Sequence, residues 1–430
     1  ITNAGNFETD GGTIKLDGSY PTGTGNTALG DTALDSIESG GNYNVAIGRN
    51  AATATTTGDN NIAIGNSSFD ANTTGSGNVA VGGDALGANT TASNNTAVGT
   101  SALLSNTTGT NNVAVGSLVL DANTTASGNT GMGYAALSSN TTGSANTAIG
   151  YGSLNANTTA ANNTAVGHSA LEVNTTGDTN TAVGKDSMKA NTTGTNNTAL
   201  GNRTLQANTT AANNVAVGDL ALGANTTGAQ NIAVGTSSLD ANTEGDYNTA
   251  IGYVALGAAT TADGNTAVGA SALESTTTGA NNTATGRAAL YANTTGANNT
   301  AFGRSALQSN TTAGDSVAIG YEALLTNTTG ANNVAVGKTA LRSNTTAANI
   351  TAVGFAALYA NTTGSANTAV GSNSLAANTT GTNNIALGTA ALAANTTGVH
   401  NTGLGFNALN DNTTGGYNTA VGNYALQTAT

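Results

Sequence analysis

The sequence is a tandem repeat of 17 residues, and this period constrains the fold more than any single motif. A glycine that follows a short apolar pair stands at Gly30 and Gly48 and then at every seventeenth residue as far as Gly422, in 24 copies. After Gly48 no insertion interrupts the register, whereas the loops of ordinary domains tolerate insertions. We therefore expect each residue of a copy to stack on the equivalent residue of the next copy.

We number the repeat from its first residue, so that Asn112 is position 1 and Gly128 is position 17. Residues 112–116 alternate bulky and small side chains, which is the period of a β-strand. Position 4 (Val115) is apolar in every copy except that of Thr285. We expect position 4 to face inward, with position 2 on the same face. The third inward column is the leucine at position 9, which is replaced only by Ala52, Phe69 and Met188.

The segments between the strands favour turns. Thr-Thr-Gly and Asn-Asn-Thr are good turn formers and poor helix formers, although one helical turn at residues 101–106 is an alternative. A unit with two short extended sides and two turns closes a coil. The sequence thus predicts an all-β protein, an elongated parallel β-solenoid (β-roll) of about 24 coils with a 17-residue repeat. We expect residues 26–430 to form this repetitive shaft and residues 1–25 to form an N-terminal junction segment.

Two asparagine columns run through the repeats. Asparagine occupies position 1 in 22 of the 24 copies, with Ser316 and Ile350 as the exceptions. A second column at position 12 includes Asn72, Asn89 and Asn106. Stacked amides can hydrogen-bond along a parallel stack, so we expect two asparagine ladders.

Positions 3 and 5 carry almost only alanine and glycine, as in Ala114 and Gly116. Because small side chains let two backbones approach closely, we expect this strip to join three copies in a homotrimer. The alternative is that alanine and glycine merely fit the narrow interior of the coil.

Composition excludes several classes of function. Only 7% of residues are charged and 4% are aromatic, and the net charge of -13 argues against nucleic acid or an anionic membrane as a partner. No apolar run is long enough for membrane insertion. His168 and His400, the only histidines, are far apart in sequence, and the carboxylates fall mostly at turns. We therefore expect no catalytic, cofactor or metal site, and no enzymatic activity.

Position 6, the residue after each repeat glycine, varies between coils and carries aromatic and charged side chains. It carries cations at Arg49, Lys185, Arg287, Arg304 and Lys338. Aromatic side chains suit a surface that binds carbohydrate or a receptor, although a corner position could also accept any residue. The candidate recognition residues are Tyr134, Tyr151, Tyr253, Tyr321, Phe355 and Phe406.

The strings Asn-Val-Ala-Ile-Gly at 44–48 and Ser-Val-Ala-Ile-Gly at 316–320 resemble the head repeats of trimeric autotransporter adhesins, whose heads are left-handed parallel β-rolls in threefold bundles. The repeat here is longer than in those heads, and no neck or coiled-coil stalk is recognised. The whole chain more closely resembles fibre-like structural proteins of marine T4-like tailed phages (cyanophages). These often carry similar arrays after a segment like residues 5–21.

The resemblance implies a structural virion fibre or appendage on the virion surface, acting as a rigid trimeric shaft for host attachment. Its partners would be further copies of the chain, other virion proteins and a host cell-surface glycan or protein. One alternative is a bacterial trimeric surface adhesin on the cell surface. The other is an ice-binding solenoid, which would need a flat outward face with paired threonines.

Overall fold

The computed structural model describes residues 7–9, 12–14 and 22–428, which form strands and turns and no helix. The all-β prediction is therefore confirmed for this part of the chain. The alternative of a helical turn at 101–106 is wrong, because Ser101 and Leu103 have φ angles of 57° and 52°. The chain divides into two compact units, residues 1–213 and 214–430.

The first unit begins with an antiparallel pair, β1 with β2, and β2 also pairs antiparallel with β3 through Ile14 and Leu29. From β3 onward the strands are parallel, as predicted, and each strand from β3 to β12 pairs with the strand 17 or 18 residues further on. Most of the predicted junction segment 1–25 lies outside the described residues, so that boundary stays a prediction. The strands are β1 Phe7–Thr9, β2 Gly12–Ile14, β3 Thr27–Leu29, β4 Val45–Ile47, β5 Ile62–Ile64, β6 Val79–Val81, β7 Thr96–Val98, β8 Val113–Val115, β9 Thr130–Met132, β10 Thr147–Ile149, β11 Thr164–Val166, β12 Thr181–Val183 and β13 Thr198–Leu200.

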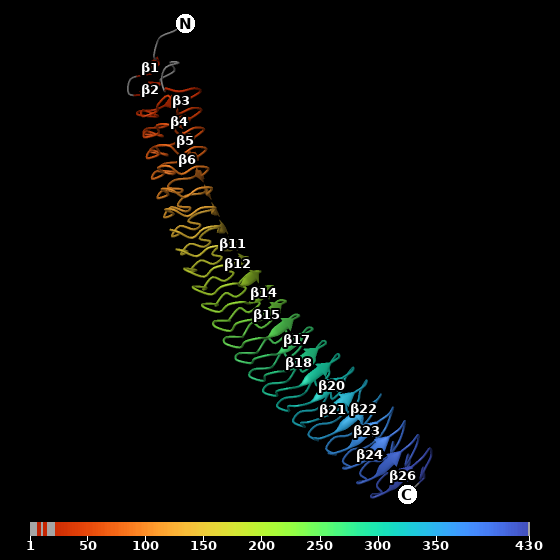
Figure 1. Ribbon diagram of the computed structural model, residues 1–430. Helices are drawn as coiled ribbons and strands as arrows, with labels where there is room; N and C mark the ends of the chain where they lie inside the picture. The colour runs from red at the N-terminus through yellow and green to blue at the C-terminus, as the bar shows by residue number, and fades with distance from the viewer. Residues whose placement is uncertain (1–6, 10–11, 15–21, 429–430) are drawn as a thin grey trace. The chain divides into compact units, whose positions relative to one another are not determined.

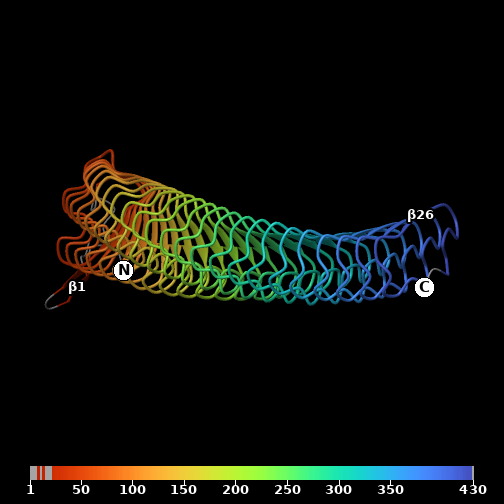
Figure 2. The same cartoon turned by 90° about the horizontal axis from the view of Figure 1, so that it is seen from below.

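The second unit is built from parallel strands alone. Equivalent residues of successive repeats are paired, for example Val334 with Thr351. Within each unit the strands lie one above another and the coils follow one another as similar loops, which is a parallel β-solenoid (Figures 1 and 2). The strands are β14 Val215–Val217, β15 Ile232–Val234, β16 Thr249–Ile251, β17 Thr266–Val268, β18 Thr283–Thr285, β19 Thr300–Phe302, β20 Val317–Ile319, β21 Val334–Val336, β22 Thr351–Val353, β23 Thr368–Val370, β24 Ile385–Leu387, β25 Thr402–Leu404 and β26 Thr419–Val421.

The strands face the opposite way from the prediction. Ala114 at position 3 is fully buried, whereas Val98 and Ile149 at position 4 are 36% and 38% exposed. Positions 2 and 4 therefore point out of the coil, and the expectation that Val115 faces inward is wrong. The reason is the width of the coil, because the leucine at position 9 fills the interior and leaves room for alanine alone on the strand.

One pair of residues shows how narrow this interior is. The small residue at position 8 is replaced in one coil by valine, Val119, which is fully buried. In the next coil the strand alanine is replaced by glycine, Gly131, and a Cβ atom added there would overlap the side chain of Val119. The extra volume of one residue is thus offset by the loss of a methyl group opposite it.

The position 9 column lies inside, as predicted. Leu120 and Met188 are fully buried, and so is Phe69. These residues have positive φ angles, 53° at Leu120, so each inward side chain leaves the backbone from a left-handed turn.

The alanine and glycine strip cannot join three copies, since its alanines are buried within their own coil. At position 5, Gly150 has a φ angle of 133°, and a Cβ atom there would overlap the carbonyl oxygen of Gly167 in the next coil. Only glycine tolerates both this φ angle and this close approach of the next coil. The alternative interpretation, that these small residues fit a tight coil, is the correct one.

Both asparagine ladders are present and buried. At position 1, the Asn61 backbone N–H donates to Oδ1 of Asn44 (2.9 Å) and its Nδ2 donates to the Gly75 carbonyl (2.9 Å). At position 12, Nδ2 of Asn106 donates to Oδ1 of Asn89 (3.1 Å). Because buried amides are costly when unpaired, these bonds hold successive coils in register.

Candidate functional site

The candidate recognition residues lie in the turn that follows each strand, and only some of them meet another ring. In the first unit, Tyr134 and Tyr151 stack with ring centroids 5.4 Å apart. The ring of His168, one coil further on, stacks on Tyr151 at 5.1 Å. Both faces of Tyr151 are therefore occupied by neighbours in the column, and the edge of its ring is left for solvent.

The four candidate residues of the second unit have different surroundings. The guanidinium of Arg304 lies 5.6 Å from the ring centroid of Tyr321, in a cation–π contact. Phe406 meets Tyr424 edge to face at 5.2 Å. No ring among the described residues stacks on Tyr253 or Phe355.

Sequence reasoning missed the roles of His168 and Arg304. Their spacing was the available signal, since each lies 17 residues from a candidate tyrosine and therefore in the same column. His400, the other histidine, stacks on Tyr417 at 4.9 Å.

In the first unit the lysines near the position 6 column are paired with acids. Lys185 lies 3.6 Å from Asp186, and Lys189 lies 3.3 Å from Glu172 and 3.5 Å from Asp186. The hydrogen bond to Glu172 and its negative charge raise the pKa of Lys189. Each of these lysines thus has an acidic partner within the chain.

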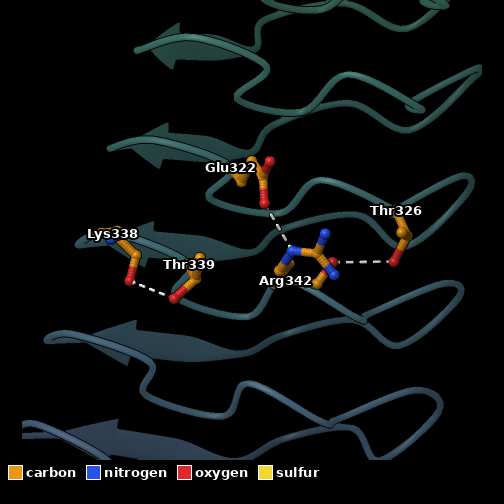
Figure 3. A network of polar contacts seen from close by, with 5 residues as sticks. All are labelled: Glu322, Thr326, Lys338, Thr339 and Arg342. Carbon is orange, nitrogen blue, oxygen red and sulfur yellow. Dashed lines mark hydrogen bonds and ion pairs between the residues drawn. The ribbon is translucent and has the colours of Figure 1, made fainter.

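In the second unit one arginine is paired and three cations are not. Arg342 donates from Nε to Glu322 in the preceding coil at 2.7 Å (Figure 3). This bond lowers the pKa of the Glu322 carboxyl, and a hydrogen bond to Glu322 raises the pKa of Tyr321. Arg287, Arg304 and Lys338, exposed at position 6, form no ion pair within the described part of the chain.

Positions 2 and 4 of the strands form a second surface, which we call the outward strand surface. Position 2 is threonine, valine or isoleucine in every copy. Position 4 is apolar in every copy except that of Thr285. Neither position carries a charged residue, although the side chains are partly exposed, for example Ile251 (40%) and Leu404 (42%). Charged residues of the solenoid are confined to the turns.

The Asn-Thr-Thr triplets match the glycosylation sequon, but in the folded coil their asparagines, such as Asn106, are buried in the ladder. Within residues 22–428 no group of three His, Asp or Glu side chains could hold a metal ion. The described residues include no helix that could span a membrane.

No family model matches the chain, and no curated protein is significantly similar to it.

Proposed function

We propose that the chain is a structural fibre protein of a tailed-phage virion, in which copies associate through the outward strand surface to form a rigid shaft for host attachment. The observation that carries the proposal is the absence of charge from positions 2 and 4 in all 24 repeats. Monomeric proteins rarely expose long contiguous apolar strips, which instead mark association surfaces.

The number of copies and the place of assembly rest on other arguments. Closed cyclic symmetry buries the strip of every copy, which an open arrangement would leave partly exposed. Three copies, and attachment to a virion, come from the resemblance of the repeats to adhesin heads and of residues 5–21 to phage fibre proteins. The proposal assigns the chain no catalytic activity.

The association can be tested with lysines placed on the outward strand surface in alternate coils, as Val81→Lys, Val115→Lys and Ile149→Lys. The side chains at these positions point out of the coil, so the coil should still fold. Desolvating a lysine on an apolar interface is costly. Analytical ultracentrifugation of wild type should give three times the chain mass of 41.3 kDa, and the variant should sediment as a single chain.

The matched control places lysines in the same three coils at the exposed position 14, as Thr91→Lys, Thr125→Lys and Thr159→Lys. This control should keep the mass of wild type. A monomeric wild type, or a strand-surface variant with the mass of wild type, would contradict association through this surface.

The location has a separate test. Antibodies raised against the purified chain should label an appendage of phage particles in electron micrographs. Labelling of the bacterial cell surface in uninfected cells would instead favour the adhesin alternative.

Ice binding is a second candidate because the outward strand surface carries an ordered column of threonines, such as Thr147, Thr164 and Thr181, next to an apolar column. Only in β18, at Thr283 and Thr285, are threonines paired across the strand, and valine or isoleucine interrupts the column. Thermal hysteresis in purified wild type that is lost in the strand-surface lysine variant would support this function instead of self-association.

A further inference from the structure

We propose that the second unit binds a linear anionic polysaccharide along the position 6 column, through Arg287, Arg304 and Lys338. These three cations belong to a run of five consecutive coils, in which position 6 is Arg287, Arg304, Tyr321, Lys338 and Phe355. We call this run the basic row.

The fold does not require the basic row. Position 6 is serine, threonine, asparagine or alanine in other coils, for example Ser117, Thr236 and Ser372, and these coils have the same strands and turns. Placing Arg287 and Arg304 in adjacent coils, about 4.8 Å apart along the stack, brings like charges together at a cost. A run that costs stability and is dispensable for folding points to binding.

The charges of the row are available to a ligand. The side chains of Arg287, Arg304 and Lys338 are exposed, and no carboxylate of the described residues pairs with them. Glu322, the residue after Tyr321, is bound by Arg342 (Figure 3). The hydrogen bond from Arg342 is the main cause that lowers the pKa of Glu322, and the charge of Arg304 contributes without an ion pair between the two. In the first unit, by contrast, Lys185 already has an acidic neighbour.

The tyrosine of the row holds one cation in place. Arg304 lies over the ring of Tyr321, so its guanidinium is held by the ring and its N–H groups remain free to bind an anion. Because Arg304 covers one face of Tyr321, that face cannot stack on a nucleic-acid base, which argues against single-stranded nucleic acid.

The spacing favours a polysaccharide with acidic sugars. Arg287 and Arg304 are one coil apart, and Arg304 and Lys338 are two coils apart. The sugars of an extended chain repeat at a length close to the coil spacing, and their carboxylates turn about the chain axis. Carboxylates that face the row can therefore recur over several coils and meet more than one of its cations. Arginine binds such carboxylates in bidentate pairs.

The test measures binding of the full chain to polygalacturonate by biolayer interferometry, with neutral dextran and a single-stranded DNA oligonucleotide as comparison ligands. The variant carries Arg287→Ser, Arg304→Ser and Lys338→Ser, since serine occurs naturally at position 6. We expect it to lose affinity for polygalacturonate by at least about tenfold, which corresponds to about 1.4 kcal/mol. Added salt should weaken wild-type binding, because exposed charges are screened.

The matched control is Lys185→Ser with Lys189→Ser in the first unit, which removes lysines that are already paired with acids and should leave affinity unchanged. Circular dichroism and melting of each variant establish that the solenoid is intact. Wild-type affinity in the triple variant, equal binding of dextran, or tighter binding of the DNA would overturn the proposal. The assay does not depend on self-association, because none of these residues belongs to the outward strand surface.

Discussion

At the scale of single residues, the leucine at position 9 combines a cost in backbone strain with a gain from burial. Leu120 has a φ of 53°, a conformation that costs an L-residue about 1–2 kcal/mol. Full burial of its side chain returns about 1.5–3 kcal/mol. Burial therefore outweighs strain, and the same balance recurs in nearly every coil.

Asp70 shows a residue-scale cost that backbone hydrogen bonds offset only in part. Burial raises the pKa of the Asp70 carboxyl above its ordinary value of 3.8. The charge of Asp84 raises this pKa further, while hydrogen bonds from the backbone N–H groups of Asp70 and Ala71 lower it. At the same position of another coil, Asn155 donates from Nδ2 to the carbonyl of Ala135, 20 residues earlier, at 3.0 Å. An asparagine at residue 70 could donate in the same way to the equivalent carbonyl, that of Asn50.

We predict that Asp70→Asn stabilises the chain at neutral pH, by about 0.5–1.5 kcal/mol for the added hydrogen bond. The raised pKa means that the native state takes up a proton at higher pH than the unfolded state does. Wild-type stability should therefore rise as the pH falls through the raised pKa, and the advantage of the variant should shrink by about pH 4. Urea unfolding at several pH values measures both effects.

Asp246→Asn is the control, because Oδ1 of Asp246 already accepts the backbone N–H of Ala229 at 2.6 Å. It should bring no gain. Equal stabilisation by both substitutions would show that general charge reduction is responsible, and not the burial of Asp70.

At the scale of the coil, the position 12 ladder has one informative interruption. Ala259 replaces the asparagine after Asn242, and Oδ1 of Asn242 is buried without a hydrogen-bond partner. Elsewhere the same atom accepts from the next coil, as Oδ1 of Asn225 does from Asn242 at 2.7 Å.

We predict that Ala259→Asn raises the free energy of unfolding by about 1 kcal/mol, because it supplies the missing donor. The site accepts the larger side chain in the other coils of the column. Asn106→Ala should lower stability by about 1–3 kcal/mol, since it leaves Oδ1 of Asn89 unpaired. Thermal unfolding compares the two, and a destabilised Ala259→Asn would show that this coil is too tight for the ladder.

At the scale of the whole chain, stability should depend on where the stack is broken, because a repeat contacts only its neighbours. We predict that Leu324→Asp, in the interior of the second unit, unfolds several coils on both sides. Leu409→Asp, one coil before β26, should release only the last coils. Both leucines are fully buried, and a buried carboxylate without a partner costs several kcal/mol.

Hydrogen exchange resolved by residue distinguishes the two variants. Loss of protection should spread over many repeats in Leu324→Asp and stay near residues 392–428 in Leu409→Asp. Equal spread in both variants would contradict nearest-neighbour behaviour.

The 17-residue period by itself determined the parallel stack, the buried leucine column and both asparagine ladders. Each of these requires only that the same residue recur in successive coils, so that neighbours such as Asn89 and Asn106 meet. The period likewise places Tyr134 and Tyr151 in one column.

Only the tertiary structure decided which face of each strand is buried. Alternation in residues 112–116 is the same whichever face is buried, and hydrophobicity alone favours Val115 inside. The volume of the coil selects Ala114, because Leu120 and the residues opposite the strand leave space for a methyl group and no more. The ion pair of Arg342 with Glu322 likewise joins two different positions of the repeat, which only the folded turns bring together.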